Sequence, residues 1–243
     1  TLNIKIYKKV FDMCVDESLR DKCVLIVMGS EGREEQSVKT DQDNALIVKD
    51  GVDVELFREP MMKLNHYLLE LGFPICSGNV MVSNEFWRRD VSGYKALIDS
   101  WVTNLSEESL QNLSIFLDAK CVAGDCMLLE ELTQYLQSTF HNRDDVLAHI
   151  AKAVLNFETP LSLFSSFVLE KSHDNKLDLK KGGIFALVHG VRILSLQYEI
   201  NETNTIQRIK ALNNKGVIDK NFATELMESF DTLSSIRLKA MLE

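Results

Sequence analysis

Apolar positions change their spacing along the first 90 residues, and the spacing predicts helices and strands in turn. Residues 4–19 carry apolar side chains at helical intervals, which predicts a first amphipathic helix. Cys23 to Met28 is a continuous β-favouring run that ends at Gly29-Ser30, which predicts a buried strand leading into a turn. A second strand is predicted from Asp43 to Val48, and a turn signal follows it.

The helical period returns between Phe57 and Leu71, and a third short strand is predicted over residues 79–83. From about residue 90 the spacing is almost wholly helical. Helices are predicted after Asp125 and near residues 144–157, 159–170, 184–199, 204–214 and 220–241, with Asp219 as the N-cap of the last. The predicted fold class is therefore α+β, with an α/β domain over residues 1–140 and a helical bundle over residues 141–243.

Composition narrows the class of protein. The net charge of −9 argues against a nucleic-acid backbone as the main partner, because proteins that bind one usually present a basic face. The apolar stretches are far shorter than a membrane span, and no signal peptide is visible. The five cysteines include no C-x-x-C pair, which predicts reduced, mostly buried thiols in a cytoplasmic protein. Because the chain begins at Thr1 without Met, we expect it to be a piece of a larger protein.

The segment from Val27 to Asn44 carries the predicted chemistry. A strand that ends in Gly29-Ser30 lets the backbone approach an anion closely, because Gly29 has no Cβ and the Ser30 hydroxyl can donate a hydrogen bond. Asp41 and Asp43 are two residues apart at the start of a strand, so their carboxylates project from the same face. Such a pair of hard oxygen ligands suits Mg²⁺ or Mn²⁺ bridging a triphosphate.

Each part of this pattern also has an ordinary structural interpretation. A lone D-x-D is commonly a turn or a solvated start of a strand, and a lone Gly-Ser after a strand is a still weaker signal. Arg33 alone would be a surface charge, and the acidic residues Glu31, Glu34 and Glu35 are expected to form a mostly solvated loop, in which Glu35 could orient Arg33. The combination of strand, Gly-Ser, polar connection and D-x-D on a second strand favours a metal-dependent phosphoryl or nucleotidyl transfer site.

At these residues the chain resembles the nucleotidyltransferase superfamily of the DNA-polymerase-β type. The version in bacterial PII-protein uridylyltransferases is similar at Gly32-Arg33, Glu35 and Thr40 to Asp43. A closer resemblance is to the nucleotidyltransferase domain of bacterial signal-transduction proteins, which commonly follows cyclic-nucleotide-binding and cystathionine-β-synthase-type (CBS) domains. Further matches with that domain and its helical C-terminal domain lie at residues 78–84 with Trp87, 116–120, 124–125, 177–183, 189–192 and 202–205.

The resemblance implies a nucleotidyltransferase-type α/β domain with a short mixed sheet, followed by a helical bundle. It also implies uridylyl or adenylyl transfer from a nucleoside triphosphate to a protein or small-molecule acceptor, and upstream CBS or cyclic-nucleotide-binding domains in the full-length chain. Asp41 and Asp43 would bind the metal, Gly29 and Ser30 would hold the phosphates, and Arg33 would lie near that charge.

One departure from the family pattern concerns the third acid. Active members usually supply a third carboxylate from a later strand, which completes the site and can act as the base. The corresponding stretch, residues 75–83, contains no acid, and Asp118 is the candidate substitute. The alternative hypothesis is therefore a catalytically inactive nucleotide-sensing or protein-interaction module.

Two weaker signals lie in the C-terminal half. Lys180 and Lys181 precede two glycines and a predicted helix, and backbone amides at a helix start could bind nucleotide phosphates there. A basic surface turn is an equally good interpretation of this segment. His189 and Arg192 share a helix face, and we favour a packed or hydrogen-bonded pair over a ligand or catalytic role.

Overall fold

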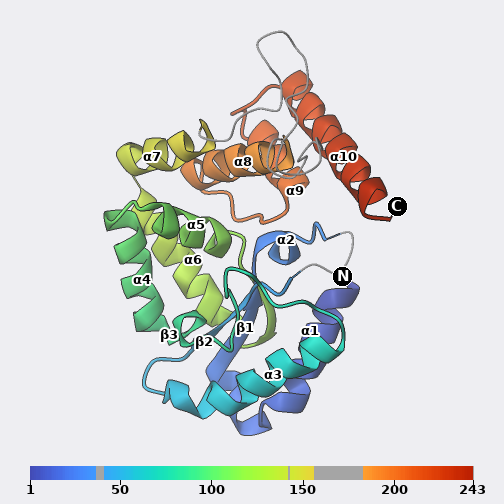
Figure 1. Ribbon diagram of the computed structural model, residues 1–243. Coiled ribbons are helices and arrows are strands. Elements are labelled where there is room, and N and C mark those ends of the chain that lie inside the picture. The colour runs from blue at the N-terminus through green and yellow to red at the C-terminus, as the bar shows by residue number, and fades with distance from the viewer. Residues whose placement is uncertain (37–40, 142, 156–182, 243) are drawn as a thin grey trace. The chain divides into compact units, whose positions relative to one another are not determined.

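The computed structural model describes residues 1–36, 41–141, 143–155 and 183–242. The chain divides into two compact units, Thr1–Thr139 and Phe140–Glu243. Figure 1 shows the helices and strands of both units. Within the described residues, no helix is both long and apolar enough to cross a membrane.

A four-stranded mixed sheet lies at the centre of the first unit. Its strands are β1 (Cys23–Val27), β2 (Asn44–Val48), β3 (Arg88–Asp90) and β4 (Lys120–Gly124), in the spatial order β3-β2-β1-β4. β1 is antiparallel to both β2 and β4, and β2 is parallel to β3. The sheet and the helical second half confirm the predicted α+β class.

Both faces of the two central strands are buried, which explains why the sequence of β1 is a continuous apolar run rather than an alternating one. Leu25 and Leu46 pack with helices α1 (Leu2–Cys14) and α3 (Arg58–Glu70), which lie side by side in Figure 1. Ile26 and Ile47 alternate with those residues along the strands and are also fully buried. The 3-10 helices η1 (Glu17–Lys22), η2 (Val54–Phe57) and η3 (Glu85–Trp87) connect these elements.

Three longer helices complete the first unit: α4 (Val91–Thr103), α5 (Glu107–Phe116) and α6 (Met127–Phe140). Asp90 caps α4 by accepting a hydrogen bond from the Gly93 amide at 2.8 Å. Trp87 and Trp101 are buried, with ring centroids 6.1 Å apart, so both serve packing.

Several sequence-based expectations for this unit are wrong. Residues 79–83 form bends and turns rather than a strand, and the Val82 amide donates its hydrogen bond to the Asn44 side chain. The segment of β4 was expected to be helical and is a strand. Cys121 and Cys126 form a disulfide rather than free thiols. Gly124, with φ of 94°, turns the chain between them and brings their Cα atoms to 5.7 Å, within the usual disulfide range.

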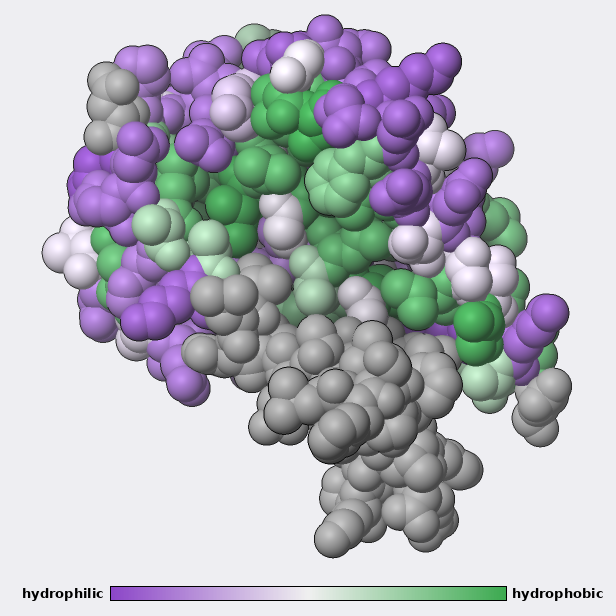
Figure 2. Space-filling model, turned by 90° about the horizontal axis from the view of Figure 1, so that it is seen from above, coloured by the Kyte–Doolittle hydropathy of each residue, from purple (hydrophilic) through white to green (hydrophobic). Residues whose placement is uncertain are grey.

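The second unit is helical where it is described. Its elements are α7 (Asp144–Leu155), α8 (Phe185–Gln197), α9 (Thr205–Asn214) and α10 (Lys220–Leu242). Asp219 caps α10, as predicted, by accepting hydrogen bonds from the Asn221 and Phe222 amides. The helix predicted near 159–170 lies outside the described residues. In the space-filling view of the whole chain, hydrophobic side chains gather in the middle of the visible face and hydrophilic ones lie along its upper part (Figure 2).

Candidate nucleotide and metal site

The corner after β1 is a very short helix, α2 (Gly29–Gly32). Gly29 has φ of 55°, in the left-handed region that favours glycine. A Cβ built at Gly29 would lie 2.6 Å from Oδ2 of Asp43, so the Asp43 carboxylate occupies the space that any other residue would need. The Gly-Ser corner and the second aspartate of the D-x-D pair are therefore immediate neighbours.

The backbone before β2 explains how the two aspartates come to share a side. The Met28 amide donates to the Asp43 carbonyl at 2.8 Å, which continues the pairing of β1 with β2. Gln42 is fully buried, and its side-chain Nε2 donates to the Phe73 carbonyl at 3.1 Å. Because successive side chains of an extended segment point in opposite directions, burying Gln42 leaves Asp41 and Asp43 together on the other, partly exposed side.

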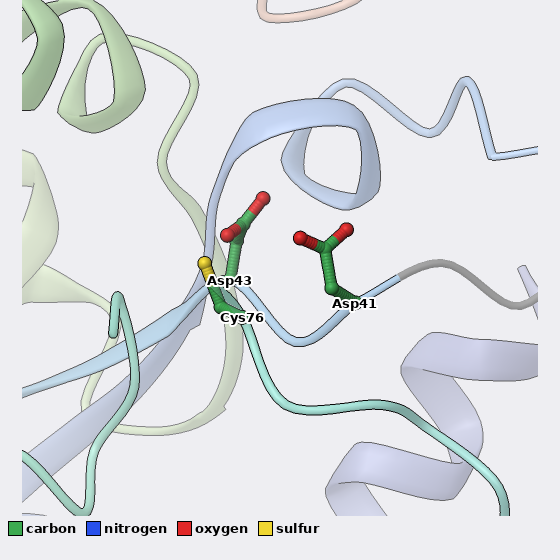
Figure 3. A group of neighbouring side chains, drawn as sticks. All are labelled: Asp41, Asp43 and Cys76. Carbon is green, nitrogen blue, oxygen red and sulfur yellow. The ribbon is translucent and has the colours of Figure 1, made fainter. Parts of the chain in front are cut away.

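The two carboxylates share their site with a thiol. One potential ligand atom from each of Asp41, Asp43 and Cys76 lies within 4.8 Å of the other two. The aspartates lead into β2, whereas Cys76 comes from the segment that follows α3, and Figure 3 shows the three side chains together. The convergence of the aspartates has the geometry that their spacing predicts. The sequence interpretation missed Cys76, although it lies in the stretch where the family pattern places a third acid.

The sulfur of Cys76 has a defined environment. Burial raises the pKa of its thiol to about 11, the Val80 and Gly78 amides act in the opposite direction by hydrogen bonding to the sulfur, and the Asp43 carboxylate adds to the increase. The Asn79 amide donates to the Cys76 carbonyl at 2.9 Å, which closes a tight turn around the side chain. The turn thus directs backbone N–H groups toward the sulfur.

The donor set fits a divalent cation. Two carboxylates held this close repel each other, and a cation between them would relieve that repulsion. Carboxylate oxygens suit Mg²⁺ and Mn²⁺, and a thiolate suits softer divalent ions. Asp41 and Asp43 are only half-buried, so positions of the cation could remain open to a ligand.

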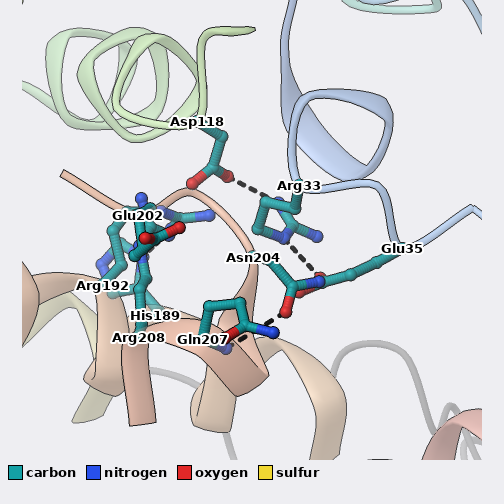
Figure 4. A network of polar contacts seen from close by, with 9 residues as sticks. All are labelled: Arg33, Glu35, Asp118, His189, Arg192, Glu202, Asn204, Gln207 and Arg208. Carbon is teal, nitrogen blue, oxygen red and sulfur yellow. Dashed lines mark hydrogen bonds and ion pairs between the residues drawn. The ribbon is translucent and has the colours of Figure 1, made fainter. Parts of the chain in front are cut away.

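The other predicted acid, Asp118, belongs to a different cluster (Figure 4). Nη1 of Arg33 donates to Asp118, whose side chain is fully buried, and Nε of Arg33 donates to Glu35 at 2.6 Å. Burial lowers the pKa of Arg33, but the Asp118 and Glu35 carboxylates more than offset this and raise it. The position of Asp118 does not support its predicted role as the third acid, because its carboxylate pairs with Arg33 and is outside the Asp41–Asp43–Cys76 group.

This ion-pair cluster holds α2 in place. Arg33 ends α2, and a Cβ at Gly32 would lie 1.9 Å from the Asp118 carbonyl oxygen, so the backbones touch there. The predicted orientation of Arg33 by Glu35 is present. The predicted role of Arg33 beside phosphates stays a prediction, since the observed contacts of its guanidinium are with carboxylates.

The expectation of a solvated acidic loop is wrong for part of it. Glu31 is only 2% exposed and accepts a hydrogen bond from Nδ2 of Asn3 at 3.0 Å. Burial raises the pKa of the Glu31 carboxyl. Glu34 instead pairs with Nζ of Lys120 at 2.7 Å. The residues after the Gly-Ser corner therefore fasten α2 to α1 and β4, which a single sequence could not reveal.

The predicted motif residues of the second unit have structural contacts within that unit. Nη1 of Arg192 donates to Nδ1 of His189 at 2.9 Å, and both side chains are buried, as the packed-pair interpretation predicts. Asn204 caps α9, and Nε of Arg208 donates to the Glu202 carbonyl at 2.6 Å (Figure 4). Lys180 lies outside the described residues.

Comparison with known families gives two matches that together span most of the chain. Residues 1–108 match the family described as "Putative nucleotidyltransferase DUF294". Residues 144–243 match the family described as "Putative nucleotidyltransferase substrate binding domain". A comparison with curated proteins finds no match.

Proposed function

Because the chain belongs to the putative nucleotidyltransferase family DUF294, we propose that it transfers a nucleotidyl group from a nucleoside triphosphate with a divalent cation held by Asp41 and Asp43. The observation that carries this proposal is the convergence of both carboxylates next to Gly29, where a Cβ would lie 2.6 Å from the Asp43 oxygen. Acidic ligands beside a close-approach backbone corner suit a metal-bound triphosphate.

Each residue of the site has a proposed task. Asp41 and Asp43 bind the cation, and Gly29, which presents no side chain, lets the Asp43 carboxylate and the bound phosphates approach the backbone. The Ser30 hydroxyl and the amides at the start of α2 donate hydrogen bonds to those oxygens. When bound, Mg²⁺ or Mn²⁺ supplies charge neutralisation for the attacking and leaving oxygens.

The ion-pair cluster of Arg33, Glu35 and Asp118 serves this site indirectly. It fixes the end of α2 to the turn before β4, so Gly29 and Ser30 keep their position beside Asp43. Nucleotidyl transfer needs phosphates and cation held in a narrow range of geometry. Arg33 and Asp118 are thus proposed as positioning residues.

The acceptor is proposed to bind through the second unit, because the family matched there is described as a substrate binding domain. The acceptor would be a protein or a small molecule that offers a hydroxyl group. The transferred group would be uridylyl or adenylyl. We further propose that Lys180 contacts phosphate and that CBS or cyclic-nucleotide-binding domains precede this chain in the full-length protein.

A second candidate function is nucleotide sensing without turnover. The observation that favours it is the thiol of Cys76, which lies beside the two aspartates where active members of the superfamily place a carboxylate. A thiol that keeps its proton at neutral pH is a poorer general base than a carboxylate. Stabilisation by metal-nucleotide without transfer would identify this function.

Transfer of label from UTP or ATP tests the main proposal. The chain is incubated with each labelled nucleotide, Mg²⁺ or Mn²⁺, and candidate acceptors, and transferred label is counted. We expect the variant carrying Asp41→Asn and Asp43→Asn to lose more than about 100-fold of the rate, since metal binding contributes several kcal/mol to such transition states. Asp21→Asn, an exposed aspartate in η1, is the matched control. Transfer that survives in the double variant would refute the mechanism.

A further inference from the structure

We propose that Cys76 is the third protein ligand of the cation site and that the site binds Zn²⁺ in preference to Mg²⁺. The inference rests on the proposed function for the place of the cation, but it concerns the identity of the ion. Its first support is the position of the sulfur, which lies within 4.8 Å of a carboxylate oxygen of both aspartates.

The distances fit one ion among three ligands. Zinc bonds a thiolate sulfur at about 2.3 Å and a carboxylate oxygen at about 2.1 Å, so two such ligand atoms in a tetrahedral shell lie about 3.6 Å apart. The observed upper bound is 4.8 Å, so binding one ion would draw the three atoms together by up to about 1 Å. Small rotations of the half-buried aspartate side chains bring all three atoms into one coordination shell.

The surroundings of the sulfur provide independent support. The backbone amides of Val80 and Gly78 hydrogen bond to the Cys76 sulfur and so fix its position beside the two aspartates. The Asn44 amide donates to the Val80 carbonyl at 3.1 Å. The same backbone contacts that fix the start of β2 therefore fix the turn that carries the thiol, and the three ligands are held together before any ion binds.

Another buried cysteine shows what a packing role looks like. Cys23 lies in β1, is fully buried in the hydrophobic core, and its Sγ donates to the Leu19 carbonyl at 3.6 Å. Cys76 differs because amides donate to its sulfur and two carboxylates lie next to it. Burial alone thus does not account for the position of Cys76.

The ligand chemistry selects the ion. Mg²⁺ prefers oxygen ligands in an octahedral shell and keeps several waters, whereas thiolate ligands select softer ions such as Zn²⁺. Two carboxylates and one thiolate give Zn²⁺ three protein ligands and leave a fourth position open. A phosphate oxygen or a water could take that position.

Cobalt spectroscopy tests whether the sulfur is a ligand. Co²⁺ substitutes for Zn²⁺ and gives a thiolate-to-metal charge-transfer band in the near ultraviolet only when sulfur is bound. We expect this band on titrating the chain with Co²⁺, its retention in Cys14→Ser, and its loss in Cys76→Ser. Cys14 is the matched control because it is a free thiol elsewhere in the first unit. Absence of the band in the native chain, or its persistence in Cys76→Ser, overturns the inference.

Affinity measurements test the preference. In chelator-buffered titrations we expect Cys76→Ser to weaken Zn²⁺ binding by at least about tenfold, since even changes around a ligand cost that much. Cys76→Asp should bind Mg²⁺ more tightly than the native chain, because it supplies a third hard ligand. Far-ultraviolet circular dichroism confirms that each variant is folded. Equal Zn²⁺ affinity in the native chain and Cys76→Ser contradicts the inference, as does tighter binding of Mg²⁺ than Zn²⁺ to the native chain.

These outcomes separate the inference from the proposed transfer reaction. Sulfur-dependent Co²⁺ and Zn²⁺ binding, with no label transfer from any triphosphate, would support the ligand assignment and refute the transfer reaction. Label transfer with Mg²⁺, together with a Zn²⁺ affinity that is unchanged in Cys76→Ser, would support the reaction and refute the ligand assignment.

Discussion

Asp43 and Asp118 both lie against the short helix α2, but their surroundings differ. The Asp43 side chain is half-buried, its carboxylate lies next to Gly29, and it shares its site with Asp41 and Cys76. The Asp118 carboxylate is completely buried and pairs with the Arg33 guanidinium. One acid shares its site with a second carboxylate, and the other is paired directly with a guanidinium.

The difference teaches how to separate a binding acid from a structural one. A buried carboxylate with a cationic partner is costly to disturb, because removing the partner leaves a charge in a medium of low dielectric constant. Clustered acids near solvent repel each other, and neutralising one of them removes that repulsion. Substitution at the Asp118 site should therefore lower stability, whereas substitution at the Asp43 site should mainly weaken ligand binding.

The largest expected change in stability is at the ion pair of Arg33 and Asp118. Arg33→Met removes the guanidinium that pairs with Asp118 and should lower the free energy of unfolding by about 3–5 kcal/mol, measured by urea denaturation. Adding Asp118→Asn to Arg33→Met should restore part of the loss, because the buried charge is then gone. If Arg33→Met, Asp118→Asn and the double variant all unfold at the same urea concentration as the native chain, the ion pair has no structural role.

Gly29→Ala should produce a smaller loss of stability but a large loss of cation binding. A left-handed backbone conformation costs a residue with a Cβ about 1–2 kcal/mol. The new Cβ would lie 2.6 Å from Oδ2 of Asp43, so the carboxylate would have to move away. Gly51→Ala is the matched control, because Gly51 also has a positive φ, of 82°, but a Cβ there would meet nothing within 4 Å. Co²⁺ affinity that falls equally in both variants would show that Asp43 is not the cause.

Asp43→Asn should change stability least among the substitutions of the acids. We expect a free energy of unfolding within about 1 kcal/mol of the native value, because a repulsive charge is removed while the shape is kept. Stabilisation by Co²⁺ or by metal-nucleotide should disappear, as thermal denaturation can measure. A loss of stability as large as that of Arg33→Met would place Asp43 among the structural acids.

The sequence was sufficient for the local parts of this comparison. The apolar run of β1, the glycine at its end and the i, i+2 spacing of Asp41 and Asp43 are each determined by a few neighbouring residues. These features predicted the corner and the shared direction of the aspartates, and both are present in the structure.

The parts that could not be predicted depend on contacts between distant segments. Asp118 pairs with a residue 85 positions earlier, and no spacing rule connects the two. Cys76 reaches the aspartates because Gln42 and Asn44 bond to the segment around it, in place of the strand that residues 79–83 were expected to form. A missing third acid was visible in the sequence, whereas the thiol that lies there required the fold.

Glu31 offers the finest test of how burial and pairing set the behaviour of acids around α2. Burial raises the pKa of Glu31, although Asn3 donates to it, so the native state holds this proton more tightly than the unfolded chain does. Stability from this group is therefore greatest at low pH and is lost as the pH rises through the native pKa. Compared with the native chain, Glu31→Gln should gain stability as the pH rises above the ordinary glutamate pKa of 4.5.

Glu34, three residues after Glu31, should change stability with pH in the opposite direction. A hydrogen bond from Lys120 lowers the pKa of Glu34, so its contribution to stability is present above the unfolded pKa and is lost as the pH falls. Compared with the native chain, Glu34→Gln should therefore lose stability as the pH rises from acidic values to pH 7. Urea unfolding of both variants across this range measures the two slopes. Slopes of the same sign would mean that burial and pairing do not distinguish these two carboxylates.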